Sequence, residues 1–267
     1  MEGESKLKTA ETDEPPFVGS RLDSEVSEDH KGSGKLTEIE NNPNKVIRRE
    51  SLDALRTRYK NKIEIVELVR IAKTLFEELE TKYGIEAPVD FIIGVDAPGN
   101  GVVYSIVDKI DGEGLGVLGD SSEALSQIQD LYASVARYYL DKLRDGGFYL
   151  NDIANEAQYV YGKKPGTEKN KIYLVDTDIY FNESSVKMYT TVVWLTRHIK
   201  EHEKNLGIVF ESAREYLQQF VNQPLPDKMS SEEKIRVTKN IEGIQKFLNH
   251  EKLGEGPIPA IPDFDIR

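Results

Sequence analysis

Cysteine is absent from the 267 residues of this chain. Disulfide bonds, thiolate nucleophiles and zinc sites with sulfur ligands are therefore excluded, and a reducing cytoplasmic location is the simplest expectation. Positive charge is also scarce, because 35 lysine and arginine residues face 47 aspartate and glutamate residues, for a formal net charge of -12. This balance argues against nucleic acid or an anionic membrane as a partner.

Long hydrophobic runs are missing as well. No stretch of the sequence approaches the roughly 20 apolar residues that a membrane helix needs. Without such a run we expect no membrane partner. The first 16 residues are polar and acidic and lack the apolar core of a secretion signal. Their low hydrophobicity and the pair Pro15 and Pro16 predict a disordered tail.

The sequence contains a series of strand signals followed by a series of helix signals. A long helix is predicted at residues 51–82, where apolar residues recur every three or four positions and Gly84 follows as a stop. Tyrosines gather at residues 132–161, where we expect them to pack half-buried. Strands are predicted at residues 45–49, 88–95 and 102–107, and further helices at residues 125–143, 186–202, 209–221 and 230–248. Strands and helices segregated in this way predict an α+β fold.

This order divides the chain into four parts. A glycine-rich stretch at residues 108–120 has the composition of a hinge between two lobes. The predicted parts are a disordered tail (1–16), an N-terminal lobe with a small antiparallel sheet and a long helix (17–112), a mainly helical C-terminal lobe (113–252) and a Pro-rich tail (253–267).

Acidic residues gather around one predicted hairpin. Asp152 precedes an aromatic strand at residues 158–161, and a second apolar strand at residues 172–175 is followed by Asp176 and Asp178. An acid before a hairpin and two acids after it lie at the same end of it. Carboxylates clustered in this way hold Mg²⁺ and orient a hydroxyl group, as a phosphoryl-transfer site requires.

Each of these signals also has a structural interpretation. An aspartate in the position of Asp152 can simply cap a turn, and Asp178 shares the side of Asp176 only if the strand continues. His198 and His202 are spaced like a zinc-binding pair on a helix, but the sequence offers no third ligand, so we do not expect a zinc site.

The order of elements resembles the protein-kinase-like fold, the superfamily that includes the aminoglycoside phosphotransferases, over residues 17–220. Gly32 and Gly34 resemble a shortened glycine-rich loop, whose backbone N–H groups would approach phosphates. Arg48 stands at the position of the phosphate-binding lysine in the third strand. Ile110 lies in a stretch similar to the hinge, whose backbone would pair with adenine.

The resemblance also implies roles in the second half of the chain. Asp152 takes the position of the catalytic aspartate, which accepts or orients the proton of the nucleophile. Asp176 takes that of the magnesium-binding aspartate, and Asp178 and Gln158 join it as expected metal ligands. The implied cofactors are ATP and Mg²⁺, and the implied substrates are a nucleotide and an unidentified hydroxyl-bearing acceptor.

Several residues depart from the family pattern. Leu150 stands where the family has a histidine, Ala157 where it has a metal-binding asparagine, and Thr177 where it has phenylalanine. Arg48 keeps the positive charge of the lysine that it replaces, but it is bulkier and forks toward oxygens. The helix glutamate that would pair with this cation is not identified among the candidates Glu64, Glu67 and Glu77.

Three functions therefore stay open. The first is an ATP- and Mg²⁺-dependent phosphotransferase. The second is a catalytically inactive, pseudokinase-like regulatory protein with a protein partner, which the departures favour. The third is a nucleotide-sugar transferase with a metal on Asp176 and Asp178, or a phosphatase with the same Asp-x-Asp pattern; both need parallel strands beside residues 172–175.

Overall fold

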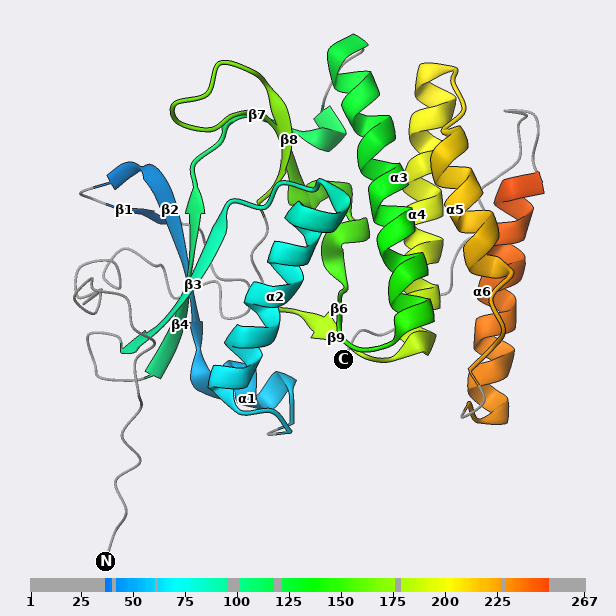
Figure 1. The fold of residues 1–267 in the computed structure, drawn as a ribbon, viewed down its shortest axis with the longest axis horizontal. Helices are drawn as coiled ribbons and strands as arrows, with labels where there is room; N and C mark the ends of the chain where they lie inside the picture. Colours follow the sequence, from blue (N-terminus) through cyan, green and yellow to red (C-terminus); the bar gives the residue numbers. More distant parts are fainter. Residues whose placement is uncertain are drawn as a thin grey trace, which may run out of the picture.

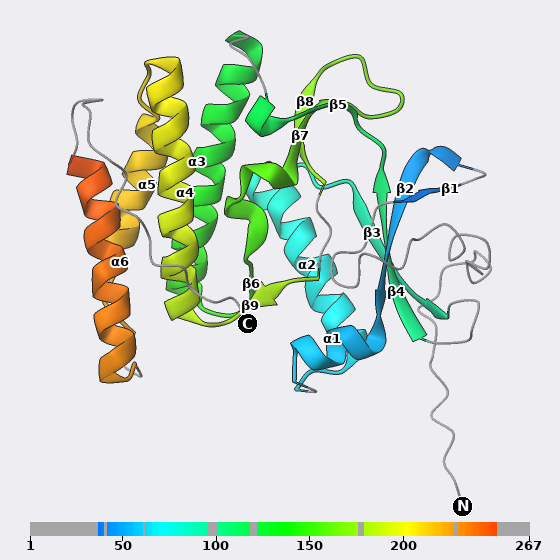
Figure 2. The same ribbon diagram turned by 180° about the vertical axis from the view of Figure 1, so that it is seen from behind.

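The computed structural model describes residues 37–39, 42–60, 62–95, 101–117, 122–175, 179–226 and 229–249. A four-stranded sheet with two helices beside it occupies one end of the molecule, and a group of long helices occupies the other (Figures 1 and 2). The described residues also form two smaller sheets. The predicted α+β class is confirmed.

The four-stranded sheet is antiparallel in the order β1-β2-β4-β3. Its two faces are distinct, because successive side chains of a strand point to opposite sides. Val103 of β4 packs into the core that contains α2, whereas Tyr104 packs with Ile47 and Val102 on the other face. The strands are β1 (Thr37–Ile39), β2 (Asn42–Ser51), β3 (Val89–Val95) and β4 (Gly101–Asp108).

The prediction of one long helix over residues 51–82 is wrong. The chain forms α1 (Leu52–Arg58) and α2 (Ile65–Tyr83), separated by a turn in which Lys60 adopts the left-handed φ of 52°. Tyr59 and Ile63 flank the polar residues Lys60 and Lys62 and pack partly buried against the core, so the turn buries its apolar side chains without a continuous helix. Gly84 ends α2 with a φ of 68°, as predicted.

The predicted hairpin is confirmed as the antiparallel pair β7 and β8. Strand β5 pairs with β7 to complete a three-stranded sheet, so part of the stretch predicted as a hinge is a strand. Strand β6 pairs with β9 in a separate two-stranded sheet. Their bounds are β5 (Asp111–Gly114), β6 (Tyr149–Leu150), β7 (Tyr159–Lys163), β8 (Lys171–Leu174) and β9 (Phe181–Asn182).

Four helices form the other end of the molecule, where helices were predicted. Ser230 starts α6 with a reciprocal cap, because its N–H donates to Glu233 Oε2 at 2.8 Å and its Oγ accepts from the Glu233 N–H at 3.2 Å. None of the described helices is both long and apolar enough to span a bilayer. The four are α3 (Ser122–Asp145), α4 (Ser185–Leu206), α5 (Glu211–Val221) and α6 (Ser231–Asn249).

One hydrophobic core connects the two ends of the molecule. It runs without interruption from Leu55 of α1 through α2 and α3 to Phe247 of α6. The boundary predicted between residues 112 and 113 therefore does not separate two cores. Tyrosines fill its centre: Tyr138, Tyr139, Tyr149 and Tyr159 are fully buried rather than half-buried.

Candidate functional site

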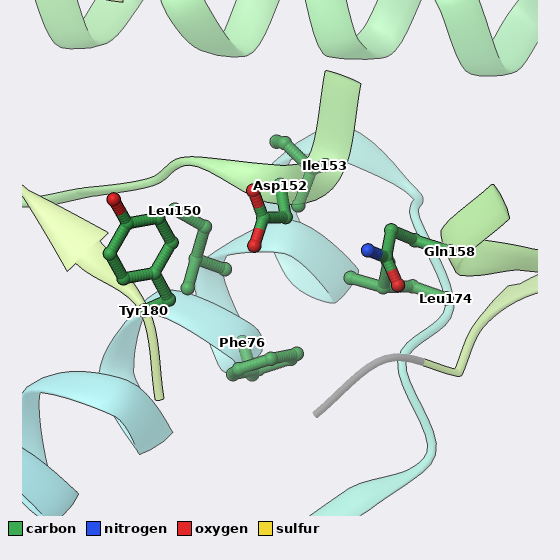
Figure 3. Close-up of a pocket in the computed structure, with 7 residues that line it drawn as sticks. All are labelled: Phe76, Leu150, Asp152, Ile153, Gln158, Leu174 and Tyr180. Atoms are coloured by element: carbon green, nitrogen blue, oxygen red, sulfur yellow. The ribbon is translucent and has the colours of Figure 1, made fainter. Parts of the chain in front are cut away.

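A small pocket lies between α2 and the loop that follows β6 (Figure 3). The carboxylate of Asp152 and the amide of Gln158 enter the same space, and the ring of Phe76 lies across from them. The cavity volume is about 20 Å³, which is room for one water molecule. The lining residues are Phe76, Leu150, Asp152, Ile153, Gln158, Leu174 and Tyr180.

Buried tyrosines fix the backbone around Asp152. The Tyr139 hydroxyl lies 3.0 Å from Leu150 O and 2.9 Å from Asn151 O, to which it can donate. The Tyr138 hydroxyl accepts from Leu150 N at 2.8 Å. Burial raises the pKa of both tyrosines, so both side chains remain neutral at physiological pH.

Two short 3₁₀ helices, η3 (Asp152–Ala154) and η4 (Glu156–Gln158), shape the loop between β6 and β7. Asn155 caps η4, because its Oδ1 accepts from Ala157 N at 3.1 Å. The Tyr159 hydroxyl donates to Ile153 O at 2.7 Å and closes the loop on itself. Asp152 and Gln158 thus enter the pocket from opposite ends of one ordered loop.

Gln158 is also tied to the end of β8. Its carbonyl accepts from Val175 N at 2.8 Å, directly before Asp176 in the chain. Leu174, the last residue of β8, lines the pocket. The predicted ligands Asp176 and Asp178 lie outside the described residues, as do Gly32 and Gly34.

Arg48 lies on the face of the sheet that packs against α2. It is the register partner of Ser105 in β4, which in turn is the partner of Phe91 in β3, so the three side chains share one face. The Phe91 ring contacts Phe76 of the pocket, with ring centroids 5.4 Å apart. Arg48 thus lies in the same cross-strand row as Phe91, which contacts the pocket residue Phe76.

The other predicted residues lie elsewhere. Ile110 stands between β4 and β5, where the chain passes from one sheet to the next, and it is not among the residues that line the pocket. Glu64 and Glu77 are exposed, and Glu67 forms an ion pair with Arg70 at 2.5 Å.

A carboxylate that sequence reasoning missed joins this loop to α4. Glu156 Oε2 lies 3.0 Å from His202 Nε2 and 3.6 Å from His198 Nδ1. These contacts with His198 and His202 hold the pKa of Glu156 well below its usual range. The i, i+4 spacing of the histidines was visible in the sequence, but their acidic partner is distant along the chain and carries no local signal.

Within the described residues, no group of three histidine, cysteine or acidic side chains is arranged to hold a metal ion. In this structure the two histidines on α4 contact the carboxylate of Glu156. Any metal site at the pocket would need a further carboxylate from outside the described ranges.

No protein-family model matches the chain, and no curated protein matches its sequence. The interpretation of the pocket therefore depends on the residues that line it and on the elements that hold them.

Proposed function

We propose that the pocket around Asp152 is the site of a Mg²⁺-dependent phosphotransferase that transfers a phosphoryl group from ATP to a hydroxyl acceptor. The supporting observation is the convergence of Asp152 and Gln158 on one space beside α2 and the end of β8. A proposed cytoplasmic location is compatible with a cysteine-free sequence.

The oxygen atoms of this site suit a hard divalent cation. Gln158 brings an amide oxygen into the pocket, a group that suits Mg²⁺. We assign Asp176 and Asp178 as the carboxylate ligands, because they follow shortly after β8 in the sequence. When bound, ATP supplies the phosphoryl group and Mg²⁺ neutralises charge on its oxygens.

Asp152 is the residue we assign to the acceptor. Its carboxylate takes the hydroxyl proton while the acceptor oxygen bonds to the γ-phosphorus, the bond from that phosphorus to the bridging oxygen breaks, and ADP leaves. Arg48 is assigned to phosphate oxygens, because its planar fork is suited to them. Gly32, Gly34 and the backbone near Ile110 complete the proposed nucleotide contacts.

The experiment measures the thermal unfolding midpoint with millimolar ATP and Mg²⁺, with and without EDTA. A ligand at about 100 times its Kd stabilises by about 2.7 kcal/mol, or about 5–10 °C for a chain of this size. We expect this shift in the wild type, and we expect EDTA to reduce it. No shift at millimolar ligand contradicts the proposal.

ATP hydrolysis, with water as the acceptor, then tests the role of Asp152. We expect Asp152→Asn to lower kcat by about 10²–10⁴-fold, the usual contribution of a general base. Asp145→Asn is the matched control, because Asp145 is exposed at the end of α3. Equal rates for the two variants would remove Asp152 from the mechanism.

A catalytically inactive regulatory protein is the second candidate function. The lining of the pocket favours it, since apolar and aromatic side chains form most of that lining. This candidate predicts no stabilisation by ATP and Mg²⁺. It also predicts that Asp152→Asn leaves binding to the regulated protein unchanged.

An Asp-x-Asp transferase or phosphatase receives no support from the strand order. Strands β7 and β8 are antiparallel. The parallel pairing at β8 is a single isolated bridge between Glu86 and Tyr173. This is not the series of parallel strands that those enzymes need.

A further inference from the structure

The end of α1 holds a segment of backbone that is distant in sequence. Tyr59 Oη donates to Ile179 O at 2.9 Å and accepts from Phe181 N at 3.0 Å. Arg58 Nη1 donates to the same carbonyl of Ile179 at 3.0 Å. The rings of Tyr59 and Phe181 also pack, with centroids 4.8 Å apart. We call Arg58 and Tyr59 the α1 clasp.

The α1 clasp is anchored to the four-stranded sheet. Arg58 Nη2 lies 2.5 Å from Glu50 Oε1 in β2. Ser51, the last residue of β2, caps α1 by accepting from Ala54 N at 3.1 Å. The position of the clasp is therefore set by β2, the strand that also carries Arg48.

The segment that the clasp holds is part of the pocket. Tyr180 lines it, and the Tyr180 carbonyl accepts from Asn151 N at 3.3 Å. Phe181 of β9 pairs with Leu150 of β6, two residues before Asp152. A displacement of this segment would therefore move the backbone from which Asp152 enters the pocket.

The hydroxyl of Tyr59 does what a phenylalanine in its place could not. It forms hydrogen bonds with the carbonyl of Ile179 and the N–H of Phe181. Strand β9 is only two residues long, so its backbone groups have few partners in a sheet. Desolvation raises the pKa of Tyr59, which keeps the hydroxyl protonated at neutral pH. Tyr59→Phe would keep the ring contact with Phe181 and remove both hydrogen bonds.

We propose that Arg58 and Tyr59 are positioning residues of the candidate site, which link the placement of β2 to the backbone of Asp152. This inference rests on the proposed function, because it assigns the α1 clasp to the phosphotransfer reaction. Catalysis is sensitive to such placement: a displacement of about 1 Å can cost about 100-fold in rate.

A purely structural clasp makes a different prediction. If the clasp were purely structural, Tyr59→Phe would lower the stability of the fold and leave kcat unchanged. Tyr83→Phe is the matched control, because the Tyr83 hydroxyl donates to Asp141 Oδ2 at 3.1 Å and joins α2 to α3 without lining the pocket. Both variants remove one tyrosine hydroxyl that connects two distant parts of the chain.

The experiment compares the full-length wild type, Tyr59→Phe and Tyr83→Phe in three measurements. These are urea unfolding, amide hydrogen exchange at Asn151 and Phe181, and kcat and KM for Mg²⁺-dependent ATP hydrolysis. We expect Tyr59→Phe alone to speed exchange at both amides and to lower kcat by about 10–100-fold. If Tyr59→Phe does not fold, Arg58→Lys replaces it, because lysine keeps the charge beside Glu50 and loses the fork.

Two results overturn the inference. One is unchanged exchange at Asn151 and Phe181 in Tyr59→Phe. The other is faster exchange with a kcat equal to that of Tyr83→Phe, which would make the clasp structural only. If the wild type hydrolyses no ATP, the proposed function fails by itself, and the exchange measurement still decides whether the clasp positions the loop.

Discussion

At the scale of single residues, the side chains that position the site have partners far away in the sequence. The backbone just before Asp152 forms hydrogen bonds with the hydroxyl groups of Tyr138 and Tyr139 of α3. Glu156, two residues before Gln158, contacts His202 of α4. The sequence shows the tyrosine cluster and predicts that it packs against other residues. Packing is correct, but the hydroxyl contacts were not predictable, because they depend on which loop lies above each ring.

Glu156→Gln tests the contact between the loop and α4. The lowered pKa of Glu156 in the wild type means that the folded state stabilises the ionised carboxylate. This contribution is fully present above the ordinary pKa of 4.5 and is lost as the pH falls through the lower pKa of the folded state. We expect Glu156→Gln to reduce the unfolding free energy by about 1 kcal/mol at pH 6, since the group is partly exposed.

The measurement is urea unfolding of the wild type and the variant at pH 6 and at pH 3.5. The difference between them should narrow at the lower pH. Glu113→Gln, on the exposed strand β5, is the control and should change little at either pH. A difference that grows as the pH falls would contradict the assignment.

At the scale of elements, one buried ion pair joins α4, α5 and α6. Glu203, of which 1% is exposed, accepts from Arg214 Nε at 2.7 Å and from Arg214 Nη2 at 2.6 Å. Arg214 Nη1 also donates to the carbonyls of Phe247 and Leu248 at the end of α6. The pair therefore connects the C-terminal end of α6 to α4 and α5.

Arg214→Leu should be strongly destabilising. The change leaves the Glu203 carboxylate buried without its cation, which costs about 3–5 kcal/mol. The control is Arg236→Leu, because Arg236 forms an exposed pair with Glu232 on α6 and should cost about 0.5 kcal/mol or less. Urea unfolding compares the two, and similar losses would show that burial of the pair is unimportant.

Two glycines allow β5 and β7 to approach closely. Gly112 and Gly162 are register partners, and a Cβ on Gly112 would overlap the backbone of Tyr161 and Gly162. We expect Gly112→Ala to cost about 1–3 kcal/mol. Gly114→Ala in the same strand meets no atom within 4 Å and is the control. Equal unfolding midpoints in urea would contradict this interpretation of the glycine-rich stretch.

At the scale of the whole molecule, the sequence predicts the types of the elements well, but it predicts their boundaries and the pairing of the strands only in part. The hairpin at β7 and β8 follows from two apolar runs around a polar turn, and Gly84 gave the end of α2. The break at Lys60 was missed, because apolar spacing continues on both sides of the turn and hides it. The order β1-β2-β4-β3 depends on contacts between segments that no local pattern contains.

The continuous core predicts how the molecule unfolds. Because one hydrophobic cluster extends from α1 to α6, we expect a single cooperative transition rather than one for each predicted lobe. Calorimetry tests this, since the calorimetric and van't Hoff enthalpies should agree. Two separate transitions would show that the parts on either side of residue 112 fold independently.

The central claim is that Asp152 and Gln158 face one nucleotide–metal site. The most direct measurement uses Mn²⁺ in place of Mg²⁺, with a slowly hydrolysed ATP analogue, and records the backbone amide resonances of the protein. EDTA-reversible broadening is expected to be strongest at Asp152 and Gln158 and weakest along α6, at the other end of the molecule (Figure 1). Broadening centred elsewhere, or none at all, would contradict it.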